Sequence, residues 1–332
     1  MWDFELGKAI GLMGRTAPFI GLRLVIYFGI TLAYVVVTGG GGGIGYMIGS
    51  TGDAESAANG AFWGATSGFA LVSGVLYFAR EYLLYMVKAG HIAVLVPLLD
   101  GQPIPEGRNQ ISHATQVVKT RFVESSVLFG VDQLIKGILR AFNRTVLTIS
   151  SFLPIPALQN VMKFVTAVIN MSLTYVDEVI LAYNIRTRQE NPWAGARDGV
   201  VLYAQNYKNL LKNALWLTVF VWLLTLLIFI VIFAPVAALV ALFPGTAGFW
   251  TFAITAITAY AFKAALIDPI AMTCLMQAYF KATEGQTPRE DWADKLNSAS
   301  GKFKELGDKA MAFAGNRFGS KAPTPAEPTT TA

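Results

Sequence analysis

The sequence predicts an all-α integral membrane protein: a polytopic helical bundle of four strong spans plus a central hairpin, about six crossings in all, with amphipathic interfacial helices. Of its 332 residues, 54% are hydrophobic and only 14% are charged, whereas soluble domains carry about 25% charged residues. Residues 213–262 contain no Asp, Glu, Lys, Arg or His. Because a helix needs about 20 apolar residues to cross a bilayer, this run predicts two spans, at 214–242 and 249–277, joined by a turn at Pro244 and Gly245.

Two more charge-free stretches lie near the N-terminus. Residues 24–52 and 56–79 contain no charged side chain, and each is long enough to cross the hydrocarbon core of a bilayer. The first stretch is too long and starts too late for a cleaved signal peptide, so we expect it to remain as a helix. We therefore predict spans at 24–48 and 56–79, preceded by an amphipathic cytoplasmic segment at 1–23.

The middle of the chain gives a weaker signal. Two short uncharged runs lie here, and the first contains Pro154 and Pro156. Because proline ends helices and favours extended backbone before it, the runs fit a hairpin with its tip at these prolines. We predict spans at 141–158 and 161–183, with a re-entrant hairpin as the alternative. The transmembrane domain then covers 24–281.

The distribution of lysine and arginine indicates which loops are cytoplasmic. Positive charge is absent from three loops that would lie on the outer side, namely 49–60, 154–160 and 244–248. Lysine and arginine instead gather near the opposite ends of the predicted spans, and loops rich in these residues stay in the cytoplasm. We therefore expect a multi-pass protein of the cell inner membrane with both termini cytoplasmic.

An amphipathic helix is predicted at 119–144, where apolar residues recur at helical spacing and charged residues fall on another face. Its basic stripe consists of Lys136, Arg140 and Arg144. We expect this stripe to bind anionic lipid headgroups on the cytoplasmic leaflet, and the alternative is a charged face that lines a water-filled vestibule. A second amphipathic pattern at 282–320 predicts a cytoplasmic tail, followed by a disordered segment at 321–332.

Ionisable residues in or beside the predicted spans are the candidate functional residues: Lys263, Asp268, Asp177 and Glu178. Charged groups at membrane depth are costly unless they are paired or hydrated, so they often mark binding sites. Interfacial, solvated positions are the alternative. Lys263 and Asp268 lie five residues apart, about 140° around an α-helix, so we do not expect them to pair directly. The adjacent acids point about 100° apart and are not expected to serve one site.

Tyrosine side chains accompany these acids in the sequence. Tyr183 and Tyr260 join the candidate set, with Tyr175 and Tyr279 also nearby. A carboxylate beside aromatic rings suits an organic cation, because the ring face attracts positive charge. Aromatic residues also gather at membrane interfaces without binding a ligand, and that interpretation stays open.

Glycine has two unusual patterns near the first hairpin. Gly60, Gly64 and Gly68 recur every four residues, a spacing that lets helix backbones approach closely. The run Gly39–Gly43 weakens a helix and predicts an unwound segment or hinge. The chain contains no P-loop motif, so these glycines do not indicate a nucleotide-binding loop.

Several functional classes are disfavoured by what the sequence lacks. Cys274 is the single cysteine, which excludes an internal disulfide and leaves it as a packing residue. His91 and His113 have no companion ligands at metal spacing, so we expect no metal and no cofactor. Catalytic motifs of the HExxH and GxSxG types are absent, so we do not expect an enzyme, and the net charge of +5 does not indicate nucleic-acid binding.

From about Phe62 onward, the order of features resembles the C-terminal half of the choline transporter-like family. The stretches that carry the resemblance are Phe78 to Leu99, Val118 to Phe142, Val200 to Leu215 and Leu266 to Leu296. The last stretch contains Asp268 within IDPIAMTCLMQAYF, followed by GQTPREDWADKL. The resemblance implies a solute carrier and points to the helices around Asp268, without assigning a ligand to any residue.

Two functions fit these observations. The first is a transporter or channel for a small solute, a quaternary amine among the candidates, with its site between the central hairpin and the last two helices. The alternative is a non-transporting membrane scaffold that recruits cytoplasmic partners or anionic lipid through its basic amphipathic helix and C-terminal tail. The expected partners are membrane lipid, a small organic cation and a second copy of the chain, and no nucleic acid.

Overall fold

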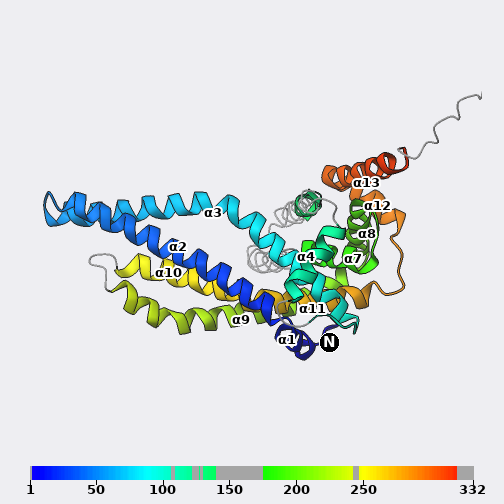
Figure 1. Ribbon diagram of the computed structural model, residues 1–332, viewed down its shortest axis with the longest axis horizontal. Coiled ribbons are helices and arrows are strands. Elements are labelled where there is room, and N and C mark those ends of the chain that lie inside the picture. The colour runs from blue at the N-terminus through cyan, green and yellow to red at the C-terminus, as the bar shows by residue number, and fades with distance from the viewer. Residues whose placement is uncertain are drawn as a thin grey trace, which may run out of the picture.

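The computed structural model describes residues 2–105, 109–121, 127, 130–139, 175–241 and 247–319, and every regular element in these ranges is helical. Figure 1 shows a long arm that projects from a body. The arm consists of α2 (Ala17–Gly49), the outer part of α3 (Ala54–Leu99), α9 (Tyr207–Val240) and α10 (Ala247–Phe262). The body consists of α1 (Leu6–Arg15), the inner end of α3, α4 (Asn109–Arg121), residues 130–139, α7 (Val176–Thr187), α8 (Pro192–Gln205), α11 (Asp268–Ala282), α12 (Glu290–Ala299) and α13 (Gly301–Gly319).

Three segments of the described chain are long and apolar enough to cross a membrane: Ala17–Gly49, Tyr207–Val240 and Thr251–Ala282. With its 34 residues, α9 is about 51 Å long at 1.5 Å per residue, more than the roughly 30 Å of a hydrocarbon core. The prediction of a helical membrane protein is therefore confirmed.

The outer surface of the arm is apolar. Exposed side chains on α2 and α9 include Val25, Phe28, Leu32, Val36, Met47, Leu223, Leu226, Ile230 and Val231. Soluble monomers rarely expose apolar patches of this extent, whereas helices in lipid satisfy their own backbone and turn apolar side chains outward. The exposed residues of α2 and α9 fall within the predicted spans 24–48 and 214–242.

The number of spans differs from the prediction, because three candidate spans stand in the described residues against about six expected crossings. The predicted span 249–277 overlaps the third of these. The segment 56–79 is helical and belongs to α3, but it is not among the three candidate spans. Residues 141–158 and 161–174 lie outside the described residues.

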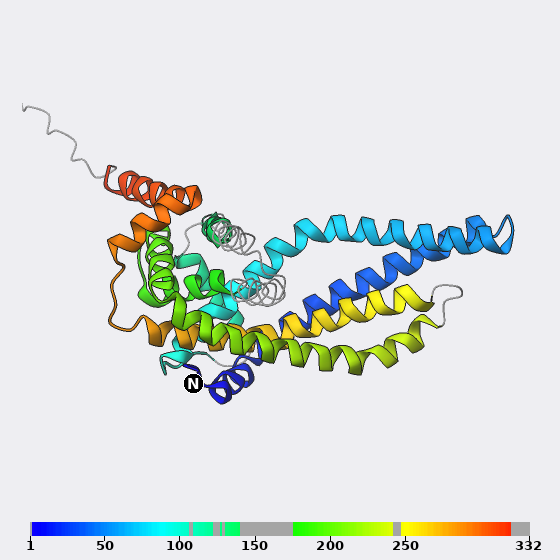
Figure 2. The same ribbon diagram turned by 180° about the vertical axis from the view of Figure 1, so that it is seen from behind.

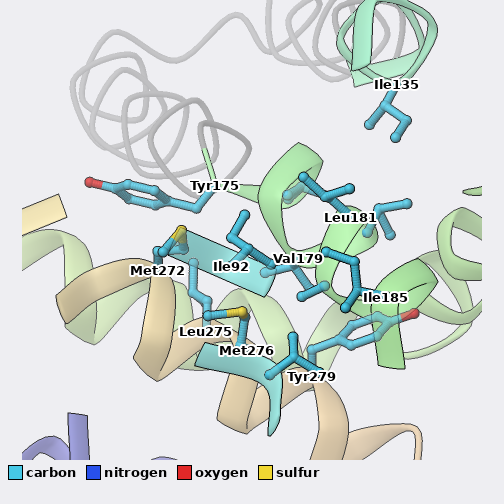
Figure 3. Packing of buried hydrophobic residues seen from close by; sticks show 14 of the residues in the cluster. Ile92, Ile135, Tyr175, Val179, Leu181, Ile185, Met272, Leu275, Met276 and Tyr279 are labelled. Carbon is cyan, nitrogen blue, oxygen red and sulfur yellow. The ribbon is translucent and has the colours of Figure 1, made fainter. Parts of the chain in front are cut away.

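The end of the predicted span 161–183 belongs to the body. Residues 176–183 form most of α7, whose Ile180 is buried in the same hydrophobic core as Ile92 of α3 and Met276 of α11. Figure 3 shows the neighbouring side chains of α7, α3 and α11 converging on this core. The apolar residues of α7 therefore pack against protein, unlike the exposed ones of the arm.

The α2–α3 hairpin is held by glycines at the outer end of the arm. Gly60, Gly64 and Gly68 of α3 face α2 so closely that a Cβ atom at Gly60 would collide with the carbonyl oxygen of Gly45. Such contacts allow the two backbones to pack directly against each other. At the tip, the Asp53 side chain accepts a hydrogen bond from the backbone N–H of Ser56 and caps α3.

The unwound segment predicted at Gly39–Gly43 is not present. α2 runs as an unbroken α-helix from Ala17 to Gly49. Gly41 of this run packs against the backbone of Gly64, so the missing side chain serves close helix packing. In lipid the backbone has no water to bond, which favours an intact helix even where glycine is frequent.

We predict that Gly45→Val destabilises the protein, whereas Gly43→Val on the same helix does not. A Cβ at Gly45 would meet the backbone of Gly60, but one at Gly43 would have nothing within 4 Å. Overpacking of this kind costs about 1–3 kcal/mol. Thermal unfolding in detergent measures the difference, and equal melting temperatures for the two variants would contradict direct backbone packing.

Candidate functional site

A cavity of about 350 Å³ lies where the arm meets the body, and we call it the charged pocket. Its charged lining residues are Lys88, Asp132, Lys136, Asp177, Glu178, Lys263 and Asp268. Its tyrosines are Tyr27, Tyr85, Tyr175 and Tyr260. These residues come from α2, α3, residues 130–139, the start of α7, α10, and the joint between α10 and α11, so the pocket exists only when arm and body pack together.

At one side of the pocket, Lys263 and Asp268 form a salt bridge with an Nζ–Oδ1 distance of 2.8 Å. The expectation that these residues do not pair is wrong. They are joined by a π-helical turn, η1 (Lys263–Ile267), in which the backbone N–H of Asp268 donates to the carbonyl of Lys263. The wider turn places residues five apart on one face.

Pro269 accounts for this π-helical turn. A proline inside a helix has no N–H to donate to the residue four positions earlier, and its ring collides with that carbonyl. The chain here accommodates Pro269 at the start of α11 by widening the preceding turn. The proline was the sequence signal for the pairing of Lys263 and Asp268.

Two tyrosines complete this side of the pocket. The Tyr175 hydroxyl donates a hydrogen bond of 2.6 Å to Oδ1 of Asp268. Nζ of Lys263 lies 5.7 Å from the centroid of the Tyr260 ring, within the range of a cation–π contact. Asp268 is therefore fixed by a cation and by a neutral donor.

The opposite side is built on the two adjacent acids of α7. Glu178 binds the ammonium of Lys88 on α3 at 2.5 Å. Asp177 lies 3.8 Å from the ammonium of Lys136, which in turn binds Asp132 at 2.8 Å. Both acids line the pocket, contrary to the expectation from their 100° separation, because α7 begins at its rim and each carboxylate reaches a different neighbouring helix.

Burial and like charge act strongly on the carboxyl pair Asp132 and Asp177. The side chains are 3% and 9% exposed, and the ammonium of Lys136 lies beside both of them. Desolvation, followed by the nearby Asp132 carboxylate, raises the pKa of Asp177 to about 7. Burial also raises the pKa of Asp132.

In the part of the chain that the structure describes, two buried carboxylate oxygens of the pocket lining have no hydrogen-bond partner: Oδ1 of Asp177 and Oε2 of Glu178. Nε and Nη2 of Arg23, which is not a lining residue, are also buried without a partner there. Arg23 lies one turn before Tyr27 on α2 and is only 2% exposed. A buried polar atom without a partner costs about 1–3 kcal/mol, so such atoms are rare in native proteins. The unpartnered carboxylate oxygens are consistent with a ligand or water that donates to them.

The structure brings together five of the six predicted substrate-site residues: Asp268, Lys263, Asp177, Glu178 and Tyr260. Tyr183 is not among them. Its ring packs 6.0 Å from that of Tyr279 inside the body.

Lys136 was expected to face lipid headgroups, but its ammonium points to Asp132 and Asp177 and lines the pocket. This placement agrees with the alternative of a charged face on a vestibule. Arg140 and Arg144 lie outside the described residues.

Sequence reasoning missed Lys88, Asp132, Tyr27 and Tyr85 as pocket residues. The sequence could have indicated Lys88, because it is a lone lysine inside the apolar helical segment Leu83–Leu99. Asp132 did not, since a charged pair with Lys136 four residues apart is common on exposed helix faces.

Within the described ranges, no three His, Cys, Asp or Glu side chains come together as a metal site. His91 instead hydrogen bonds to Thr16 at 2.9 Å and stacks on Phe19.

No family model, curated protein or solved structure matches the chain. The resemblance to the choline transporter-like family therefore stays a prediction.

We predict that the stability of the protein falls as pH rises from about 4 to about 7, and that Asp177→Asn flattens this dependence. The unfolded Asp177 loses its proton near its ordinary pKa of about 3.9, whereas the folded residue keeps it up to about 7. The folded state thus binds more protons in this window, and its stability declines by at most about 1.4 kcal/mol per pH unit.

Thermal unfolding in detergent between about pH 5 and 8 tests this prediction. Asp294→Asn is the control, because Asp294 lies exposed on α12. A pH profile that is the same in Asp177→Asn and in the wild type would contradict the assignment.

Proposed function

We propose that the protein transports a small organic cation across a membrane and binds it in the charged pocket. The observation that supports this is the convergence of Lys263, Asp268, Asp177 and Glu178 on one cavity where the spans enter the body. Ionisable residues at an internal cavity are expected of a carrier. A scaffold has no need to bury them, so the transport function is favoured over the scaffold.

The charge of the pocket supports a cation as the ligand. Four acids and three lysines are among the described lining residues. Within the described part of the chain, Oδ1 of Asp177 and Oε2 of Glu178 have no hydrogen-bond partner. A bound cation would give these buried oxygens a positively charged partner.

The tyrosines make an organic cation fit better than a metal ion. Four tyrosine rings line the pocket, and ring faces attract ammonium groups. Hard metal ions instead require several oxygens at short, fixed distances. An alkylated ammonium group uses both the carboxylates and the rings.

The placement of the pocket suits a carrier. Trp2 and Trp216 contact each other at the base of the arm and are 50% and 51% exposed. Exposed tryptophans are typical of the membrane–water interface. With the body in the cytoplasm of an inner-membrane protein, as the lysine and arginine distribution favours, the pocket lies at the cytoplasmic end of the spans.

We predict that a cysteine at Thr51 reacts with an impermeant thiol reagent in intact cells, whereas a cysteine at Ser298 reacts only after lysis. Thr51 lies at the tip of the arm and Ser298 on the body, and both are exposed. The native Cys274 is buried and gives little background. Labelling of Ser298→Cys in intact cells would invert the proposed orientation.

We predict that Asp268→Asn abolishes uptake of choline, used as a quaternary-amine probe, by proteoliposomes while the protein still folds. The amide keeps an oxygen that can accept from Tyr175 but loses the negative charge beside Lys263. The uptake assay is paired with thermal unfolding in detergent.

Asp198→Asn is the matched control, because Asp198 is a partly buried acid of α8 outside the pocket that hydrogen bonds to Gln189. Normal uptake by a stable Asp268→Asn protein would reject the proposed site. Loss of stability together with uptake would assign Asp268 to packing.

A further inference from the structure

A second cavity, of about 270 Å³, lies within the arm between α2, α3 and α10, and we call it the arm cleft. Its lining is almost wholly apolar or aromatic and includes Ile30, Tyr34, Phe69, Ala256 and Ile257. The cleft lies among helices whose outer faces carry exposed apolar side chains. Figures 1 and 2 show α10 lying along α2 in this part of the arm.

The arm cleft adjoins the charged pocket. Tyr27 and Tyr260 line both cavities, so the two meet at these rings. The charged pocket is rich in carboxylates and lysines, whereas the arm cleft lies among apolar helices. A tyrosine suits this boundary, because its ring is apolar and its hydroxyl is polar.

The bulky side chains around the cleft are fixed by their own contacts. The rings of Tyr34 and Phe69 lie 5.3 Å apart, and the Tyr34 hydroxyl donates to Ser73 at 3.2 Å. The cleft is therefore bounded by residues that α2 and α3 hold in place.

We propose that one amphiphile occupies both cavities, with an amine-bearing head beside Asp177 and Glu178 and an alkyl chain in the arm cleft. This inference rests on the proposed function, since it requires that the charged pocket takes an organic cation. It adds that the substrate class is an amine with a chain of several methylene groups.

The polar end carries the head because the buried, unpartnered atoms of its described lining residues are carboxylate oxygens, Oδ1 of Asp177 and Oε2 of Glu178. An ammonium group supplies positive charge and, where it carries hydrogens, donors as well. The apolar end takes the alkyl chain because moving methylene groups out of water is favourable in free energy. The side chains of Tyr34, Phe69 and Ile257 offer the chain an apolar surface there.

The test compares tetramethylammonium with octyltrimethylammonium, which share a head and differ in the chain. The full-length protein is placed in nanodiscs of phosphatidylglycerol, because this lipid has no amine to compete, and empty discs give the background. We expect the octyl compound to bind at least about 10-fold more tightly, since several methylene groups are buried. Octyl sulfate, which has the chain but an anionic head, should not compete.

Ala256→Phe fills the arm cleft, so it should remove the additional affinity that the octyl chain provides. It should leave the affinity for tetramethylammonium unchanged. Ala238→Phe is the matched control, since Ala238 is exposed on α9 and lies outside the cleft. If Ala256→Phe does not fold, Phe69→Ala widens the cleft instead and should shift the preference from octyl to decyl chains.

Equal binding of both amines to the wild type, or a chain-length preference that neither cleft variant changes, would overturn the inference and leave the proposed function standing. Competition by octyl sulfate would overturn the assignment of the head. Absence of binding by either amine would reject the proposed function together with the inference.

Discussion

Charged side chains are buried where the arm joins the body, and they need partners of opposite charge. The ion pairs that they form determine how the elements around this joint are packed. A charge removed from water is costly unless it is paired in good geometry. Each pair at the charged pocket therefore ties neighbouring elements together: Lys88 of α3 binds Glu178 of α7, and Lys136 joins residues 130–139 to Asp177 of α7. The first of these contacts holds the inner end of α3 against α7 within the body. Because α3 continues without a break into the arm, the same residues that form a candidate site also anchor the arm.

The arm was largely predictable, whereas the pocket was not. Span length depends on apolar runs, which are local, so α2 and α9 appear where 24–48 and 214–242 were predicted. The pocket depends on contacts between segments far apart in the chain, and a charge such as Asp132 has the same sequence pattern on an exposed face as beside a cavity. The prediction that Lys263 and Asp268 do not pair was wrong for another reason. It assumed regular α-helical geometry across a turn that Pro269 widens.

α2 serves two interfaces of opposite character along its length. Near the tip its glycines bring the backbone against α3, as at Gly45 and Gly60. Nearer the base, α2 instead presents Tyr27 and Tyr34 to the arm cleft, which is lined on another side by Ala256 and Ile257 of α10. Small side chains thus close one end of the hairpin while large rings leave space at the other. This distribution explains why a cleft lies beside the charged pocket and not at the tip of the arm.

The two sides of the charged pocket differ in how completely their acids are partnered. In a purely structural cluster the acids would be saturated, because each buried oxygen without a donor lowers stability. Here Lys263 and Tyr175 both contact Oδ1 of Asp268. Within the described residues, Asp177 and Glu178 each keep a buried oxygen without a partner. The side at Asp268 is therefore already fixed in this state, and the side at α7 is left to receive positive charge. A cation of the kind proposed above would contact acids that already join α3, α7 and residues 130–139, so its binding would be coupled to the packing of these elements.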